Sequence, residues 1–198
     1  MNTTQRILLT VVLLISAVPQ GHAAPAKYND ERASQAMMQA AYDGDLGRLR
    51  VLLAHGASLA AKDDSGENAL VWAVNGGQVR SVDFLLDHGA SASDKNGVEA
   101  LFTAVDEGQA SIVKSLIKHG ANVNARGDSG ETPLMIACFY DPGEDNAFGQ
   151  SADIVKLLLA HGADVHVKNY KGKTALMYLA NMPNARIHKM LLAAGEKT

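Results

Sequence analysis

Cysteine is nearly absent from this chain of 198 residues, in which Cys138 is the only one. A single cysteine cannot form an intramolecular disulfide, so a small disulfide-stapled fold is excluded. The apolar run around Cys138 favours a core position, where a thiol behaves as a small hydrophobic group. A nucleophilic role is the weaker alternative, because the residues at the same position of the other repeats are the expected core fillers Ala41, Val74, Val105 and Ala180. No Ser-containing elbow or phosphate-binding loop is present in the sequence.

Positive charge and aromatic side chains are also scarce. The 18 basic residues are outnumbered by 21 acidic ones, which gives a net charge of −3. This balance provides no basic surface for phosphates, so nucleic acid is not expected as a partner. The aromatic side chains are one Trp, five Tyr and four Phe. Those outside a core register are therefore candidates for contact with another protein.

One long apolar run is present, at residues 7–18, and it follows a single basic residue and precedes small residues. This pattern is typical of a secretory signal peptide. As a helix the run spans about 18 Å, short of the roughly 30 Å of a bilayer core, so a permanent anchor is the weaker alternative. We expect residues 1–23 to be the signal, cleaved after Ala23 or Ala26, and residues 24–198 to be a periplasmic or secreted domain, without membrane attachment after cleavage.

The tripeptide His-Gly-Ala organises the rest of the chain. It begins at His55, His88, His119 and His161, and a degenerate copy is found at Ala194-Gly195, at intervals of 33, 31, 42 and 33 residues. A period in the low thirties indicates a solenoid. Each unit has two apolar runs of helical spacing separated by a polar or glycine break, and the glycine is suited to end the second helix. The expected repeats are residues 31–60, 61–93, 94–125, 126–167 and 168–198.

The repeats resemble the ankyrin family, most closely in residues 128–134 (DSGETPL) and 154–165 (IVKLLLAHGADV). The resemblance implies an all-α solenoid of about five helix–turn–helix repeats with short hairpin-like fingers. Thr132 is suited to cap its helix, with Pro133 at the first helical position. The other repeats depart from this pattern at 68–69, 99–100 and 174–175, where we expect weaker capping. The third connector is two residues shorter, which predicts a shorter finger.

No catalytic residue, metal ligand or cofactor is predicted. Four of the seven histidines are the repeat histidines, and successive helical layers lie about 8–10 Å apart, too far to share one ion. Repeat four contains an insertion of nine residues, 141–149, whose Asp141, Glu144 and Asp145 offer oxygen ligands. It lacks the ligand spacing of a calcium loop, so a solvated loop is favoured over a calcium site. A long loop on a regular scaffold is often functional.

Ankyrin proteins bind other proteins through their fingers and the concave face of the first helices, so the resemblance implies a partner site there. By register this site comprises Tyr42, Asp64, Glu67, Asn75, Lys95, Asp106, Glu131, Phe139, Tyr140, Phe148, Tyr170 and Lys171. The insertion is expected at its centre. Trp72 lies at a core register and is not included.

The chain is similar to small exported bacterial ankyrin proteins. Some of these neutralise secreted toxins as immunity proteins, and others assist peroxide-detoxifying catalases. The resemblance therefore implies a non-enzymatic module, monomeric alone, that binds a toxin or, as the alternative, supports a periplasmic catalase. An enzyme using Cys138, or a metal-binding protein, is the weaker alternative.

We expect the mature protein to begin between Ala24 and Lys27 and to be released from cells by osmotic shock. N-terminal sequencing and intact mass of the released protein measure this directly. An intact Met1 on the released protein, or recovery from the cytoplasm alone, would contradict the prediction.

Overall fold

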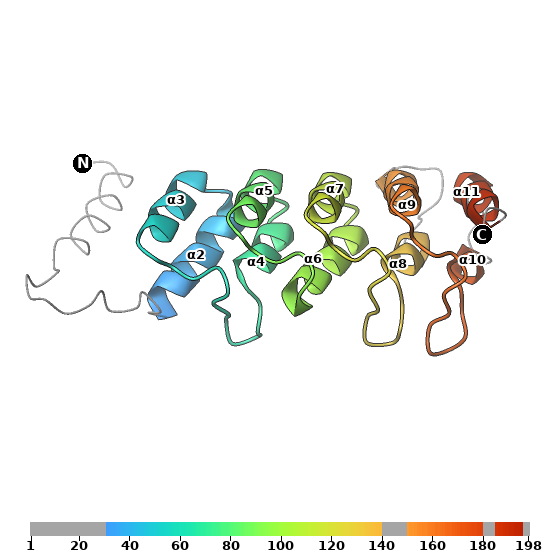
Figure 1. Ribbon diagram of the computed structural model, residues 1–198, viewed down its shortest axis with the longest axis horizontal. Coiled ribbons are helices and arrows are strands. Elements are labelled where there is room, and N and C mark those ends of the chain that lie inside the picture. The colour runs from blue at the N-terminus through green and yellow to red at the C-terminus, as the bar shows by residue number, and fades with distance from the viewer. Residues whose placement is uncertain (1–30, 140–149, 180–184, 196–198) are drawn as a thin grey trace, which may run out of the picture.

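The fold is a row of stacked helix–turn–helix repeats in a computed structural model (Figure 1) that describes residues 31–139, 150–179 and 185–195. The first helices of the repeats form an inner row beside the fingers, and the second helices form an outer row. The inner helices are α2 (Glu31–Asp43), α4 (Ala69–Asn75), α6 (Lys95–Asp106), α8 (Pro133–Phe139) and α10 (Ala175–Tyr178). The outer helices are α3 (Leu46–Ala54), α5 (Val79–Asp87), α7 (Ala110–Lys118), α9 (Gln150–Ala160) and α11 (Ala185–Gly195).

The structure confirms the predicted all-α ankyrin-type solenoid, and the residues it describes contain no β-strand. None of the helices within those residues is long and apolar enough to cross a membrane. The predicted signal peptide at residues 1–23 and the insertion at 141–149 lie outside the described residues, as do Tyr140 and Phe148.

A continuous core runs between the two rows of helices. Inner-helix leucines such as Leu70 and Leu101 are at most 1% exposed, and outer-helix leucines such as Leu85 and Leu116 are fully buried. Each fully buried leucine contributes roughly 1.5–3 kcal/mol relative to an exposed one. Because each repeat contacts the next through this core, no repeat buries its apolar face alone.

Cys138 lies in this core. Its side chain is fully buried, as are those of its counterparts Ala41 and Val74 in earlier repeats, and Val105 is 3% exposed. The register that predicted a small core filler at this position is therefore confirmed.

Three fingers are tight hairpins built to one plan. In each, a backbone N–H bonds to the carbonyl four residues later: Asp63 to Glu67, Gly127 to Glu131, and Asn169 to Lys173. The third finger differs, because α6 begins at Lys95 and Asp94 caps it by accepting from the Gly97 N–H at 2.8 Å. The shorter connector therefore extends the inner helix, which places Lys95 at the start of α6 and not on a hairpin tip.

The helix caps correct two expectations. Residues 99–100, where weaker capping was expected, lie inside α6, which Asp94 caps. Asn68 was expected to cap α4 weakly, yet its side-chain oxygen accepts from the N–H groups of Leu70 at 3.0 Å and Val71 at 3.2 Å. Asn is among the strongest N-cap residues, and here it is buried with both bonds made. Thr174 at the start of α10 makes no side-chain cap bond, as expected. Thr132 does bond the Met135 N–H, at a long 3.4 Å.

Replacing Asn68 with Ala should lower the free energy of unfolding by about 1 kcal/mol or more, because two buried N–H groups lose their acceptor. Thr174→Ala is the matched control at the equivalent cap and should cost clearly less. Urea denaturation followed by circular dichroism measures both. Equal losses at the two positions would contradict the assignment of the cap to Asn68.

Candidate functional site

The predicted partner-site residues that the structure describes lie along one surface. We call it the inner face, meaning the fingers together with the C-terminal ends of the inner helices. Tyr42, Asn75, Asp106 and Phe139 lie at or next to the ends of successive inner helices. The fingers and the start of α6 provide the remaining ones: Asp64, Glu67, Lys95, Glu131, Tyr170 and Lys171. All ten are exposed or half-buried.

An aromatic pair lies where repeats one and two meet. The rings of Tyr42 and Trp72 are edge to face, with centroids 6.3 Å apart and an interplanar angle of 75°. The indole Nε1–H of Trp72 donates to Asp63 Oδ2 at 2.8 Å. Asp63 Oδ1 in turn accepts from the N–H groups of Ser65 and Glu67 within the finger. The finger therefore fixes the orientation of the indole.

A second pair of the same kind lies where repeats four and five meet. Phe139 and Tyr178 are edge to face at 5.8 Å and 87°. The Asn169 side-chain N–H donates to the Tyr178 hydroxyl at 2.8 Å, and Asn169 Oδ1 accepts from the N–H groups of Lys171 and Lys173. Lys173 also places its ammonium 5.6 Å from the centroid of the Tyr178 ring, within cation–π range.

The two pairs occupy equivalent positions in the repeat. Tyr42 and Phe139 share one register position, and Trp72 and Tyr178 share another, nine residues after the finger residue that bonds each of them. The intervening repeats lack aromatic residues at both positions, which hold Asn75, Thr103, Asp106 and Ile136. Since those repeats stack without aromatic residues, stacking alone does not require the pairs.

Trp72 was left out of the predicted site because of its core register, and in the structure it is half-buried and packs against the core. Its indole also reaches Asp63 and the ring of Tyr42. The sequence reasoning did not single out Tyr178, which makes the matching contact with Phe139. The signal available in the sequence was the shared nine-residue spacing between Asp63 and Trp72 and between Asn169 and Tyr178, which occurs in these two repeats.

Tyr170 has a packing role in the structure as well as exposure. Its ring lies against Gly130 of the preceding finger, where a Cβ would come within 2.9 Å of the ring. Its backbone N–H donates to the Ser129 carbonyl at 3.1 Å. The ring is nevertheless 73% exposed, so a wide part of it remains accessible on the inner face.

Two groups of carboxylates lie on the inner face. Burial, together with the negative charges of Glu99 and Asp63, raises the pKa of Glu67 above its ordinary value. Burial and the charge of Asp106 likewise raise the pKa of Glu107, although the Gln109 amide donates to this carboxylate and opposes the shift. The causes show that these carboxylates repel one another.

Asp63 differs from its neighbours. Burial would raise its pKa, but hydrogen bonds from Trp72 and from the N–H groups of Glu67, Ser65 and Gly66 outweigh burial and hold it below the ordinary value. Asp63 is therefore a structural carboxylate that stays ionised to hold the finger and the indole.

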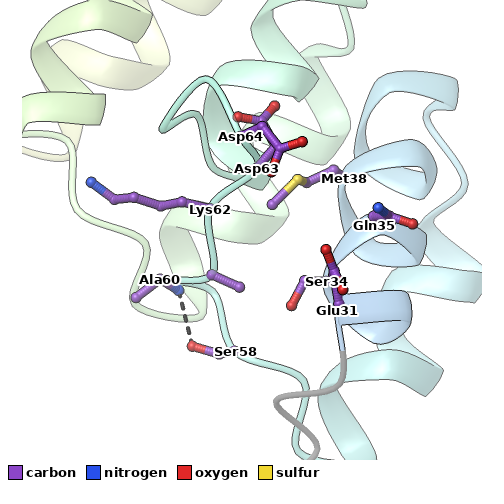
Figure 2. Close-up of a pocket in the computed structure, with 10 residues that line it drawn as sticks. Glu31, Ser34, Gln35, Met38, Ser58, Ala60, Lys62, Asp63 and Asp64 are labelled. Atoms are coloured by element: carbon purple, nitrogen blue, oxygen red, sulfur yellow. Dashed lines mark hydrogen bonds between the residues drawn. The ribbon is translucent and has the colours of Figure 1, made fainter.

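A groove of about 420 Å³ lies between α2 and the second finger (Figure 2). Met38 lies on the α2 side with Glu31 and Gln35, and Asp63 and Asp64 lie on the finger side. Figure 2 shows Lys62 extending away from the two aspartates. The groove is thus acidic, and it adjoins the Tyr42–Trp72 pair through Asp63.

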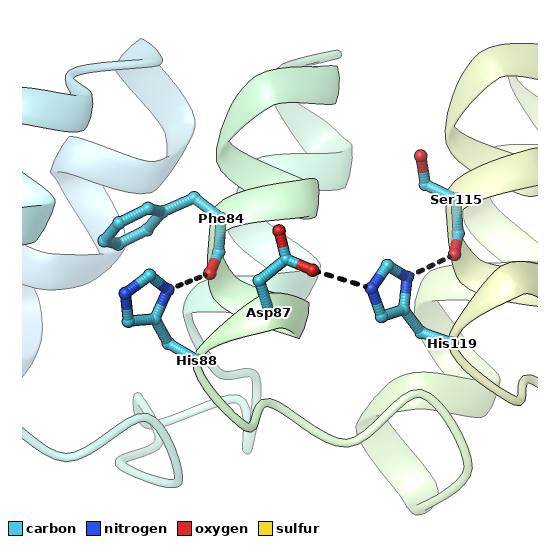
Figure 3. A network of polar contacts seen from close by, with 5 residues as sticks. All are labelled: Phe84, Asp87, His88, Ser115 and His119. Carbon is cyan, nitrogen blue, oxygen red and sulfur yellow. Dashed lines mark hydrogen bonds and ion pairs between the residues drawn. The ribbon is translucent and has the colours of Figure 1, made fainter.

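The repeat histidines have a structural role. The Nδ1 atoms of His55, His88, His119 and His161 lie 2.7–2.9 Å from the carbonyl four residues earlier. His119 also places Nε2 3.0 Å from Asp87 of the preceding outer helix (Figure 3). No group of three potential metal ligands occurs in the described ranges, which leave out the insertion.

We expect Glu67→Gln to raise the melting temperature at pH 7, because the raised pKa of Glu67 means that its ionised form is disfavoured in the fold. For such an acid, stability falls as pH rises through the window above its ordinary pKa of about 4.3, so the advantage should shrink towards pH 4. Thermal melts across this range measure it. In a Glu99→Gln background the gain should be smaller, and a Glu67→Gln protein that melts lower than the parent at pH 7 would contradict the prediction.

Comparison with known proteins agrees with this architecture. The family model for ankyrin repeats matches in three copies, at residues 8–96, 75–169 and 127–198. The probable palmitoyltransferase AKR2 of Saccharomyces uvarum is 31% identical over 93 residues, which are 47% of this chain and 13% of that protein. The likeness thus covers a small part of that larger protein. With matches along nearly its whole length, the chain belongs to the ankyrin-repeat family.

Proposed function

We propose that this chain is a non-enzymatic module that binds one partner protein in the periplasm through its inner face. Ankyrin repeats are protein–protein interaction modules, and this supports the general function. The observation that carries the specific site is the presence of two oriented aromatic pairs at positions where the intervening repeats have none. Tyr42 is 44% exposed and Phe139 is 52% exposed, so each pair offers an accessible ring.

Orientation by hydrogen bonds makes these rings suitable for binding. Interface hot spots are enriched in aromatic residues, and a side chain ordered before binding loses less entropy when the complex forms. Trp72 and Tyr178 are held by their fingers in this way. The buried thiol of Cys138 argues against the enzyme alternative, because a nucleophile must reach its substrate.

The role we favour is that of an immunity protein that neutralises a secreted toxin. A row of repeats that presents one fixed surface suits tight one-to-one binding. Support of a periplasmic catalase is the alternative. Loss of protection against a co-produced toxin, on removal of this protein, would support the first role, whereas lower peroxide tolerance would support the second.

Affinity capture from a periplasmic extract, followed by quantitative mass spectrometry, should recover one dominant partner. The double variant Tyr42→Ala/Phe139→Ala should recover at least tenfold less of it, because both accessible rings are removed. Val51→Ala is the matched control, since Val51 is 44% exposed on the outer helix α3, and should recover as much as the parent.

Equal recovery by the parent and the double variant would contradict the proposed site, provided that circular dichroism shows both to be folded. Deleting residues 141–149 tests the predicted contribution of the insertion in the same capture. Recovery that is unchanged by the deletion would assign binding to the fingers and helix ends alone.

A further inference from the structure

We propose that the partner presents an extended polypeptide segment with cationic side chains lying against repeats two to four. In this arrangement two apolar side chains of the segment dock on the Tyr42–Trp72 and Phe139–Tyr178 pairs. The inference rests on the proposed function and adds the chemistry, length and direction of the bound segment.

The two aromatic pairs provide separate anchor points. One pair joins repeats one and two and the other joins repeats four and five, so three repeat intervals separate them. At about 8–10 Å for each layer, the anchors are about 24–30 Å apart. An extended chain advances about 3.3 Å per residue, so about seven to nine residues span this distance.

The surface between the anchors is negatively charged. The second to fourth fingers and the inner-helix ends of repeats one to three carry ten carboxylates and three cations, a net charge of −7. The carboxylates are Asp43, Asp63, Asp64, Glu67, Asp94, Glu99, Asp106, Glu107, Asp128 and Glu131, and the cations are Lys62, Lys95 and Arg126.

None of these ten carboxylates forms an ion pair with a cation among the described residues. The ion pairs found there join His119 to Asp87 and Arg186 to Asp153, and both pairs lie on the outer helices. Arg126 directs its guanidinium to the carbonyls of Gly130 and Lys168. Burial first, and then the neighbouring negative charges, raise the pKa values of Glu67 and Glu107, so a cation placed beside these carboxylates by a partner would stabilise their ionised forms.

The groove beside the Tyr42–Trp72 pair is also suited to a cationic side chain. Glu31, Asp63 and Asp64 line it together with one cation, Lys62, so three carboxylates there could face the charged end of a lysine or arginine. Asp63 connects this groove to the first anchor, because it accepts the hydrogen bond from the Trp72 indole. An acidic or neutral segment would leave this face uncompensated.

The fifth finger gives the bound segment a direction. It carries Lys168, Lys171 and Lys173 and no carboxylate, so the sign of the charge changes between the fourth and fifth fingers. The cationic part of the segment must therefore lie towards repeat two. An acidic side chain is favoured at the end that faces repeat five.

Selection from a phage-displayed library of random 12-residue peptides against the purified protein tests the inference. Enriched peptides should have two aromatic or large aliphatic residues separated by about seven to nine positions, with Lys or Arg between them. Synthetic peptides of those sequences are then titrated against variants by fluorescence anisotropy at low and high salt.

Tyr42→Ala and Phe139→Ala should each weaken binding at least tenfold, with Val51→Ala as the control on the outer row. Glu67→Gln/Glu107→Gln should weaken binding about threefold at low salt and reduce its salt dependence, whereas Asp83→Asn on α5 should do neither. If an alanine variant does not fold, Tyr42→Leu or Phe139→Leu keeps the apolar volume and should still weaken binding by removing the ring.

The outcomes separate the two proposals. Peptides that need the aromatic pairs but show no preference for Lys or Arg would overturn the cationic segment and leave the inner-face site intact. Peptides that bind equally to all inner-face variants would overturn both proposals. A library that yields no enrichment would overturn the extended segment, and the capture experiment would then decide on the inner face alone.

Discussion

The stacking of one repeat on the next is the constraint from which the other features of this molecule follow. Small buried residues at the same register, Ala73, Ala104 and Ala137, let successive inner helices approach closely. The helices cannot change their spacing without opening this core, because protein interiors are close-packed. The fingers and helix ends are therefore held at regular intervals. Equivalent residues of successive repeats lie in a row on the inner face, so a change of residue type from one repeat to the next changes the chemistry along that row.

The sequence was sufficient to predict the fold because the same pattern of buried apolar positions recurs in several repeats. In repeats two to four a buried leucine (Leu70, Leu101 or Leu134) is followed three residues later by a buried alanine. The position of Cys138 could likewise be predicted from its counterparts in other repeats, without knowledge of its chemistry. Because the pattern recurs in several repeats, it stays recognisable when one repeat departs from it. The same regularity allowed ten exposed or half-buried residues to be assigned by register to the fingers and inner-helix ends, and their role in binding stays a prediction.

The aromatic pairs could not be found in this way because they depend on contacts between repeats. The register of Trp72 suggested a core residue, but an indole has a polar N–H that needs an acceptor when it is buried, and Asp63 on the finger provides one. The contribution of Asn68 to the stability of α4 was likewise underestimated, because it depends on the two buried N–H groups from which its side chain accepts hydrogen bonds. In both cases the decisive partner is fixed by three-dimensional geometry, which periodicity does not encode.

Because α10 is short, the stability of the last repeat depends on the contacts that Tyr178 makes at the surface. This inner helix has four residues, a single turn that is not stable by itself, and Tyr178 is its last residue. The turn is held by the bond from Asn169 and by the ring of Phe139. In the proposed complex, a ligand on that ring pair would contact α10 only where the turn is formed, so by mass action its binding would stabilise the last repeat against unfolding.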